Sequence, residues 1–334
     1  MPKNFFELTQ RGQAKRLREL GLQALQHYDL QVERVRLITN DFNGIFRVDT
    51  RDGEKYLLRI ALPTGGHNLA NFRSEMEWLH ALSQDTHLPV PAPLPTRAGS
   101  WVIEAAARGV PEARLCMVFS WVPGSSLSIQ LTGDNVRKFG HLSAQLHLHA
   151  QNFKPSTIFE ILRFDTLFPF PEPVLLFDEA YAPMFPPQRK EIFMQGLDRA
   201  QAALDRLKAS GEKMRVLHGD LHHWNVHVYR GRLYPFDFED LMWGWPVQDI
   251  ATTLYYWAGR EDFADLLQAF KIGYISAAPW PERYPGEINT FIALRGIGLA
   301  NFILQDPNPD WQAEAPEFIA RTEQMIQRLL GAAV

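Results

Sequence analysis

Residues 216–249 read VLHGDLHHWNVHVYRGRLYPFDFEDLMWGWPVQD, and they carry the most specific pattern in the chain. Two strand-like runs, at residues 226–229 and 232–236, flank an Arg-Gly pair at residues 230–231. A two-residue connection between strands that contains glycine is typical of a tight β-hairpin. The sequence therefore predicts one rigid hairpin in the middle of this stretch.

Three polar side chains would converge because of this hairpin. Asn225 would stand at its start, Asp237 at its end, and Asp220 on the loop that leads into it. A carboxylate can orient a hydroxyl group and take its proton, and an amide oxygen with a second carboxylate offers the hard oxygen ligands that Mg²⁺ prefers. Phosphoryl transfer requires an oriented hydroxyl, metal ions and charge stabilisation. The grouping therefore favours phosphoryl transfer.

The chain before this stretch predicts a mainly β first lobe. Residues 11–28 have helical spacing, and Phe72, Met76 and Leu79 mark a second helix at i, i+4 and i+7. Short β-rich runs separated by turn-forming residues lie at residues 32–38, 44–50, 55–60, 100–105 and 114–122. We expect these runs to form antiparallel strands.

A mainly helical second lobe is predicted after residues 123–126 (PGSS). Apolar residues at helical spacing mark helices around residues 136–146 and 263–270. Residues 155–187 are rich in proline and aromatic side chains, and the sequence assigns no regular structure to them. We therefore expect an α+β fold of two lobes, an antiparallel β lobe over residues 1–122 and a mainly α-helical lobe over residues 123–334.

The motif HGDLxxxN, followed by DF, resembles the catalytic signature of the aminoglycoside phosphotransferase, choline kinase and homoserine kinase superfamily, which has a protein-kinase-like fold. The resemblance implies that Asp220 is the catalytic base and that Asn225 and Asp237 are magnesium ligands. Asp249 matches a later aspartate of the family, whose implied role is to brace the catalytic loop. The implied cofactors are ATP and Mg²⁺, and the implied acceptor is a hydroxyl of a small molecule such as homoserine, choline, a sugar or an aminoglycoside.

The first lobe carries two further parts of the resemblance. The turn at residues 40–44 is similar to the family's nucleotide-covering turn, which makes Asn43 and Gly44 candidate nucleotide contacts. The run at residues 117–122 resembles the hinge where adenine bonds to backbone, and it includes Phe119 and Trp121.

Arg59 stands on the third predicted strand, where protein kinases use lysine. By the resemblance it would neutralise ATP phosphates and pair with Glu75 on the following helix. A planar guanidinium can bridge a phosphate and a carboxylate at once. An ordinary exposed ion pair is the alternative for these two residues, and we expect the neighbouring acids Glu239 and Asp240 to be solvated.

Composition limits the class of protein. The 334 residues carry a net charge of −4, which gives no reason to expect nucleic acid or an anionic membrane as partner. Cys116 is the only cysteine, so an intrachain disulfide is excluded. No uninterrupted apolar run approaches the roughly 20 residues that span a bilayer. We expect a cytoplasmic monomer or homodimer.

Three other functions stay open. A protein serine/threonine kinase of the same superfamily would fit the motifs, although only eleven residues separate Asp237 from Asp249, which favours a small acceptor. A metal-dependent hydrolase could use the cluster of His218, His222, His223 and His227. A nucleotide-binding pseudokinase is the third alternative, but every expected catalytic residue type is present.

Overall fold

The computed structural model describes residues 4–40, 43–62, 66–306 and 308–331. The chain forms two compact units, which are described separately. The first contains residues 1–124, 154–160 and 234–239, and the second contains residues 125–153, 161–233 and 240–334. The antiparallel sheet of the first unit and the helices of the second confirm the predicted α+β class.

Five antiparallel strands make the sheet of the first unit, in the order β1-β2-β3-β5-β4. They are β1 (Val32–Thr39), β2 (Gly44–Thr50), β3 (Lys55–Ile60), β4 (Ile103–Ala105) and β5 (Arg114–Ser120). Leu58 of β3 and Val118 of β5 are directly paired, and both are fully buried. Strand β3 therefore lies in the middle of the sheet, where Arg59 is held between two neighbours.

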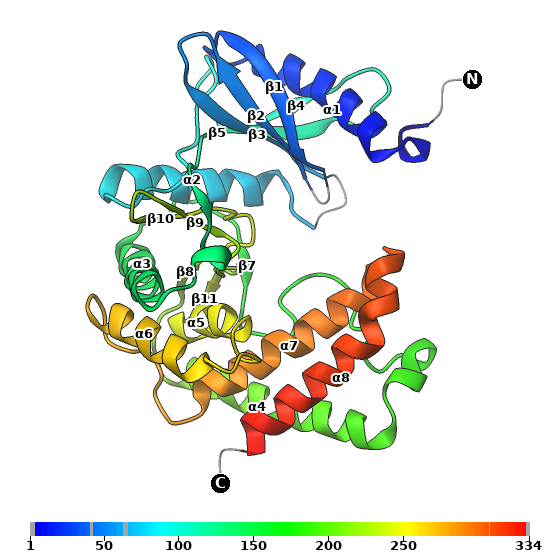
Figure 1. Cartoon of the computed structure of the whole chain (residues 1–334), viewed down its shortest axis with the longest axis vertical. Helices are drawn as coiled ribbons and strands as arrows, with labels where there is room; N and C mark the ends of the chain where they lie inside the picture. The colour runs from blue at the N-terminus through cyan, green and yellow to red at the C-terminus, as the bar shows by residue number, and fades with distance from the viewer. Residues whose placement is uncertain (1–3, 41–42, 63–65, 307, 332–334) are drawn as a thin grey trace. The chain divides into compact units, whose positions relative to one another are not determined.

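Three described helices belong to the first unit, and the first of its two α-helices packs its apolar face on the sheet. They are the short 3₁₀ helix η1 (Phe5–Glu7), α1 (Gln10–Leu25) and α2 (Leu69–Asp85). Leu17 and Leu20 of α1 share one core with Phe46 and Leu58 of the sheet, and Figure 1 shows α1 in dark blue beside β1 and β4. Asn68 caps α2 by accepting bonds from the first backbone N–H groups, as its place before the helix favours.

Six α-helices and two 3₁₀ helices belong to the described part of the second unit. They are η2 (Leu127–Gln130), α3 (Gly133–Asn152), η3 (Glu179–Met184), α4 (Pro187–Ala209), α5 (Pro246–Tyr255), α6 (Phe263–Ile275), α7 (Glu287–Gln305) and α8 (Pro309–Gly331). Helices α3 and α6 pack at unusually close range. A Cβ at Gly140 would lie 1.9 Å from the backbone oxygen of Phe270, so only glycine allows this contact.

Short strands connect these helices. They are β6 (Ser125–Ser126), β7 (Leu162–Arg163), β8 (Arg215–Leu217), β9 (Val226–Tyr229) and β11 (Met242–Gly244), while β10 (Arg232–Pro235) begins in the second unit and ends in the first. Strands β7, β11 and β8 form one small sheet. Between residues 155 and 186 the regular elements are β7 and η3, and α4 begins at Pro187.

Helix α7 is long and apolar enough to cross a membrane by length and composition, although Arg295 interrupts its sequence. Most of this helix is buried in the second unit, where it packs against α4, α5 and α8. A core helix passes the same test as a membrane span.

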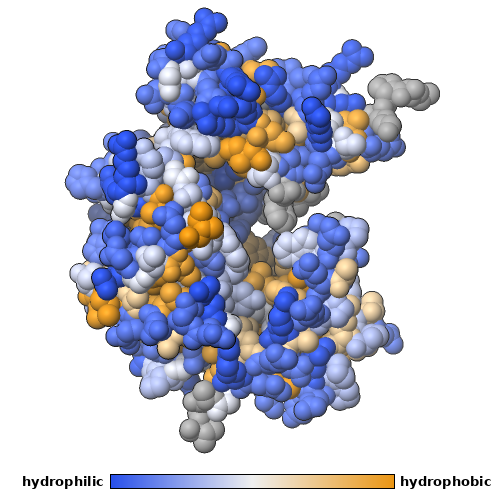
Figure 2. All heavy atoms as spheres, viewed as in Figure 1, coloured by the Kyte–Doolittle hydropathy of each residue, from blue (hydrophilic) through white to orange (hydrophobic). Residues whose placement is uncertain are grey.

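Polar side chains cover most of the surface visible in Figure 2, and among the described residues the exposed large hydrophobic side chains include Phe6 and Trp224.

Candidate active site

The loop between β8 and β9 holds the predicted base. Gly219, which precedes Asp220, has φ +82°, and a Cβ there would lie 1.9 Å from the backbone oxygen of Asp240. Only glycine can adopt this conformation against that backbone without strain. Packing therefore requires the glycine of the HGD sequence, in addition to the chemical role predicted for its aspartate.

Asp249 braces this loop from the first turn of α5, as the resemblance implied. Its carboxylate accepts bonds from the backbone N–H of Gly219 at 3.0 Å and of His218 at 3.2 Å, and it lies 3.1 Å from His147 Nε2. Burial alone would raise the pKa of Asp249, but the hydrogen bond and charge of His147 outweigh burial and lower it. The ionised carboxylate thus fixes the backbone that carries Asp220.

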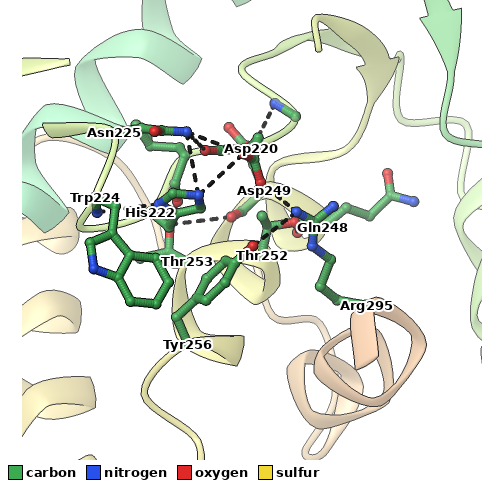
Figure 3. Close-up of polar contacts among 12 residues, drawn as sticks. Asp220, His222, Trp224, Asn225, Gln248, Asp249, Thr252, Thr253, Tyr256 and Arg295 are labelled. Carbon is green, nitrogen blue, oxygen red and sulfur yellow. Dashed lines mark hydrogen bonds and ion pairs between the residues drawn. The ribbon is translucent and has the colours of Figure 1, made fainter. Parts of the chain in front are cut away.

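Asp220 is surrounded by three side chains that favour its ionised form (Figure 3). Arg295 of α7 forms an ion pair with Oδ1, His222 Nε2 lies 3.2 Å from Oδ2, and Asn225 Nδ2 donates to Oδ2 at 3.1 Å. Burial would raise the pKa of Asp220, but the charge of Arg295 and the hydrogen bond of His222 lower it below its ordinary value. The carboxylate is therefore ionised at neutral pH.

Asn225 fits the cation-ligand assignment through its remaining amide atom. Its Nδ2 donates to both the side chain and the backbone oxygen of Asp220, the latter at 3.0 Å. This orientation leaves the amide oxygen as the acceptor atom, and an amide oxygen is a suitable ligand for Mg²⁺. The side chain is buried, so its direction is fixed by packing as well.

Asp237 belongs to the first unit and has an uncommon backbone conformation. Its φ is +67°, which non-glycine residues adopt at a cost of about 1–3 kcal/mol. The following Phe238 is fully buried and packs edge-to-face on Trp78, at 5.8 Å between ring centroids. Phe238 therefore anchors the chain at this point, whereas Asp237, the residue before it, is exposed.

Arg59 and Glu75 form a buried ion pair rather than an exposed one. Their side chains are 5% and 3% exposed, and Nη2 of Arg59 donates to Glu75 Oε2. Burial would lower the pKa of Arg59, but the charges of Glu75 and Glu239 outweigh burial and raise it. The guanidinium also lies 5.0 Å from the ring centroid of Phe119, a distance at which cation–π attraction contributes.

Glu239 corrects one expectation, because it is not simply solvated. Its Oε2 accepts a bond from Asn43 Nδ2 at 2.7 Å and lies 3.4 Å from Arg59 Nη1. Asn43 in turn accepts a bond from the backbone N–H of Leu62 at 3.1 Å. Glu239 therefore links the predicted nucleotide turn to Arg59. Residues 41–42 of that turn lie outside the described residues.

The remaining predicted nucleotide contacts are aromatic. Phe119 is buried in β5, and Trp121 follows the strand with its ring centroid 5.4 Å from the guanidinium of Arg47. Gly44 begins β2. Roles for these residues in adenine or phosphate binding stay predictions.

The histidines near Asp220 are engaged in hydrogen bonds. His222 Nδ1 accepts from the backbone N–H of Trp224 at 3.2 Å, and His223 Nδ1 accepts from Trp257 Nε1 at 3.0 Å. Burial and the charges of His222 and Arg260 lower the pKa of His223 to about 4. Over the described ranges, no three or more His, Cys, Asp or Glu side chains are grouped to hold a metal ion.

Arg295 was not foreseen from the sequence. It lies within an otherwise apolar helix, and it contacts both Asp220 and the hydroxyl of Tyr256, 3.1 Å away. A charge inside an apolar helical pattern was the available indication, because a buried charge requires a partner. The sequence could not name that partner.

Comparisons with known proteins identify the family and the fold. Residues 34–286 match the family model described as the phosphotransferase enzyme family. The chain is 27% identical over 235 residues to amicoumacin kinase of Bacillus subtilis strain 168, and the match covers 70% of this chain and 66% of that protein, slightly under two thirds.

Two solved structures have the same fold. A microcompartment-associated aminopropanol kinase superposes with a TM-score of 0.76 at 20% identity, over 93% of this chain and 96% of the other. An amicoumacin kinase in complex with AMP-PNP and Ca²⁺ superposes with a TM-score of 0.73 at 20% identity, over 95% and 96%. With its family model matched over more than half of its length, the chain belongs to the phosphotransferase enzyme family.

Proposed function

We propose that this protein transfers the γ-phosphate of ATP to a hydroxyl group of a small molecule. The observation that carries the proposal is the fixed, ionised carboxylate of Asp220, on a loop held by Asp249. The family membership and the complex of a similar fold with an ATP analogue support the choice of ATP.

Asp220 would orient the acceptor hydroxyl and take its proton. The hydroxyl oxygen forms the new bond to the γ-phosphorus, the bond from that phosphorus to the bridging β,γ-oxygen breaks, and ADP leaves. The proton passes to the carboxylate of Asp220. A loose transition state requires little base strength, so an aspartate with a lowered pKa can act mainly by orientation.

The nucleotide would be held by charges of the first unit. Arg59, fixed by Glu75, would donate to the ATP phosphates, and Asn43 would hold the covering turn. Asn225 and Asp237 are the residues that would hold Mg²⁺, which supplies neutralisation of phosphate charge. Phe119 and Trp121 would be the residues of the adenine hinge.

The acceptor class that the second unit favours is a small amino alcohol. Trp224 is 51% exposed although it is aromatic, and its ring lies 5.2 Å from that of Tyr256. An exposed indole beside the base offers a face to an ammonium group. Aminopropanol, the substrate named for one similar fold, is such a compound.

The direct test is ADP release measured with 1-amino-2-propanol, homoserine, choline, a sugar and an aminoglycoside as acceptors. Asp220→Asn should lower kcat on the accepted compound about 10²–10⁴-fold while Mg-ATP affinity changes little. Asp265→Asn, an exposed aspartate on α6, is the matched control and should keep full activity. Wild-type turnover by Asp220→Asn would remove the base from the proposal.

A further inference from the structure

A cavity of about 170 Å³ in the first unit borders the predicted nucleotide turn through Asn40 and Gly44, but none of the residues assigned above to base or cation binding lines it. It opens between η1, α1 and the end of β3, and most of its walls are apolar. Its lining includes Phe5, Phe6, Leu17, Ile60, Asn40 and Arg114. An apolar cavity of about 150 Å³ in another protein is known to take benzene, so this volume suits a ligand of one small ring or a short chain.

Arg114 contributes a buried positive charge to this cavity. Arg114 is only 3% exposed, and its Nε has no hydrogen-bond partner among the described residues. Within the described ranges no carboxylate forms an ion pair with Arg114, although the charge of the exposed Glu112 acts on it from a longer distance. Burial lowers the pKa of the Arg114 guanidinium, and the charge of Glu112 opposes burial only in part.

Comparison with Arg59 shows how unusual this is. Arg59 is equally buried, but Glu75 neutralises it. A buried charge normally has a partner, because desolvation without compensation costs several kcal/mol. The ring of Phe5 lies near Arg114, with its centroid 6.0 Å from the guanidinium carbon. Because no described carboxylate pairs with Arg114, an anion from outside the chain would supply the missing counter-charge.

One wall of the cavity is also exposed to solvent. Phe6 is 66% exposed and packs edge-to-face on buried Phe5, at 5.5 Å between centroids. A large aromatic side chain at the mouth of an apolar cavity gains from covering a bound apolar group. The cavity thus pairs a charged end with an apolar body and an accessible aromatic rim.

We propose that this cavity binds a small organic monocarboxylate, with the carboxylate paired to Arg114 and the apolar body packed against Phe5, Leu17 and Ile60. The guanidinium fork matches a carboxylate in a bidentate arrangement. Binding is non-covalent and requires no nucleotide. Inorganic phosphate offers the charge but no apolar body, so it is the discriminating comparison.

Thermal unfolding of the full chain tests the site with benzoate and hexanoate, beside benzamide, 1-hexanol and inorganic phosphate. Both carboxylates should raise Tm in a saturable manner, because they bind only the folded state. The neutral analogues and phosphate should leave Tm almost unchanged. Equal shifts with phosphate, or no shift with either carboxylate, would overturn the proposal.

Arg114→Met separates charge from packing. It should leave the Tm of the free protein unchanged or higher, because an uncompensated buried charge is removed, and it should weaken benzoate binding by about tenfold or more. Arg108→Met, at an exposed arginine of the same unit, should keep the shift. Retained binding in Arg114→Met contradicts the assignment.

A second variant covers failure of Arg114→Met to fold. Ala61→Leu fills the cavity from its apolar wall and keeps Arg114. It should lose the carboxylate-dependent rise in Tm, and persistence of that rise would place the ligand elsewhere.

Discussion

Each unit contains a charged network that includes a proposed site residue, and these two networks differ in how far water reaches them. In the first unit the side chains of Arg59 and Glu75 are 5% and 3% exposed. In the second unit those of Asp220 and Arg295 are 20% and 17% exposed. The first pair is closed on itself, whereas the second presents a carboxylate to solvent.

This difference separates two tasks that a phosphotransferase must perform. A closed pair fixes a guanidinium whose remaining N–H groups can meet a phosphate without reorganisation, which is how preorganised charge lowers a barrier. An open carboxylate must receive a new hydroxyl in each cycle, so it has to stay accessible. The difference in burial therefore matches a preorganised charge for the nucleotide phosphates in the first unit and an accessible carboxylate for the acceptor hydroxyl in the second.

The largest effect is expected from Glu75→Gln. It leaves the charge of Arg59 buried with only Glu239 3.4 Å away, and breaking a buried pair in this way costs about 3–5 kcal/mol of unfolding free energy. Chemical denaturation measures this loss. The double variant Arg59→Met/Glu75→Leu should recover much of the stability and still lose Mg-ATP affinity, which would separate scaffold from function. If Glu75→Gln has the same free energy of unfolding as the wild type, the buried charge of Arg59 does not depend on Glu75 for its compensation.

A smaller effect is expected from Arg295→Met, in the open network. Removal of the cation raises the pKa of Asp220 towards its ordinary value, because burial then acts with less opposition. The acid limb of the pH–kcat profile should therefore move to higher pH. The contribution of Asp220 to the free energy of unfolding should move in the same direction along the pH axis. A carboxylate whose folded-state pKa is lowered stabilises the fold above its unfolded-state pKa, and this contribution is lost as pH falls through the folded-state pKa.

Arg295→Lys is the matched control, since it keeps the positive charge. Its acid limb should stay closer to the wild-type position. If Arg295→Met leaves the profile where it was, the titrating group in catalysis is not Asp220.

Much of this could be predicted because local pattern and local chemistry coincide. Strand β3 is predicted from a β-rich run between turn-forming residues and helix α2 from apolar residues at helical spacing, and the family resemblance implies the pairing of Arg59 with Glu75. The loop residues Asp220 and Asn225 could be placed because only five positions separate them. Partners that come from distant segments could not be foreseen.

Glu239 and Arg295 show why. Glu239 meets Asn43 across 196 positions of sequence, and Arg295 meets Asp220 across 75. A single sequence shows that a charge interrupts an apolar helix, but the identity of its counter-charge depends on how helices α5 and α7 pack. Spacing carries no information on such contacts.

The smallest effect is expected at a neutral, buried contact of the second unit, between Trp257 and His223. Trp257→Phe removes the N–H that donates to Nδ1 of His223, at a cost of about 0.5–1.5 kcal/mol at neutral pH. The donor favours neutral imidazole, so its removal should raise the pKa of His223 from about 4. Wild-type stability should fall as pH drops from about 6.5 to about 4, because the unfolded chain binds the proton first. The variant should lose less over this interval, and proton NMR titration of His223 measures the shift directly. An unchanged titration would mean that burial alone, rather than the indole, keeps this histidine neutral.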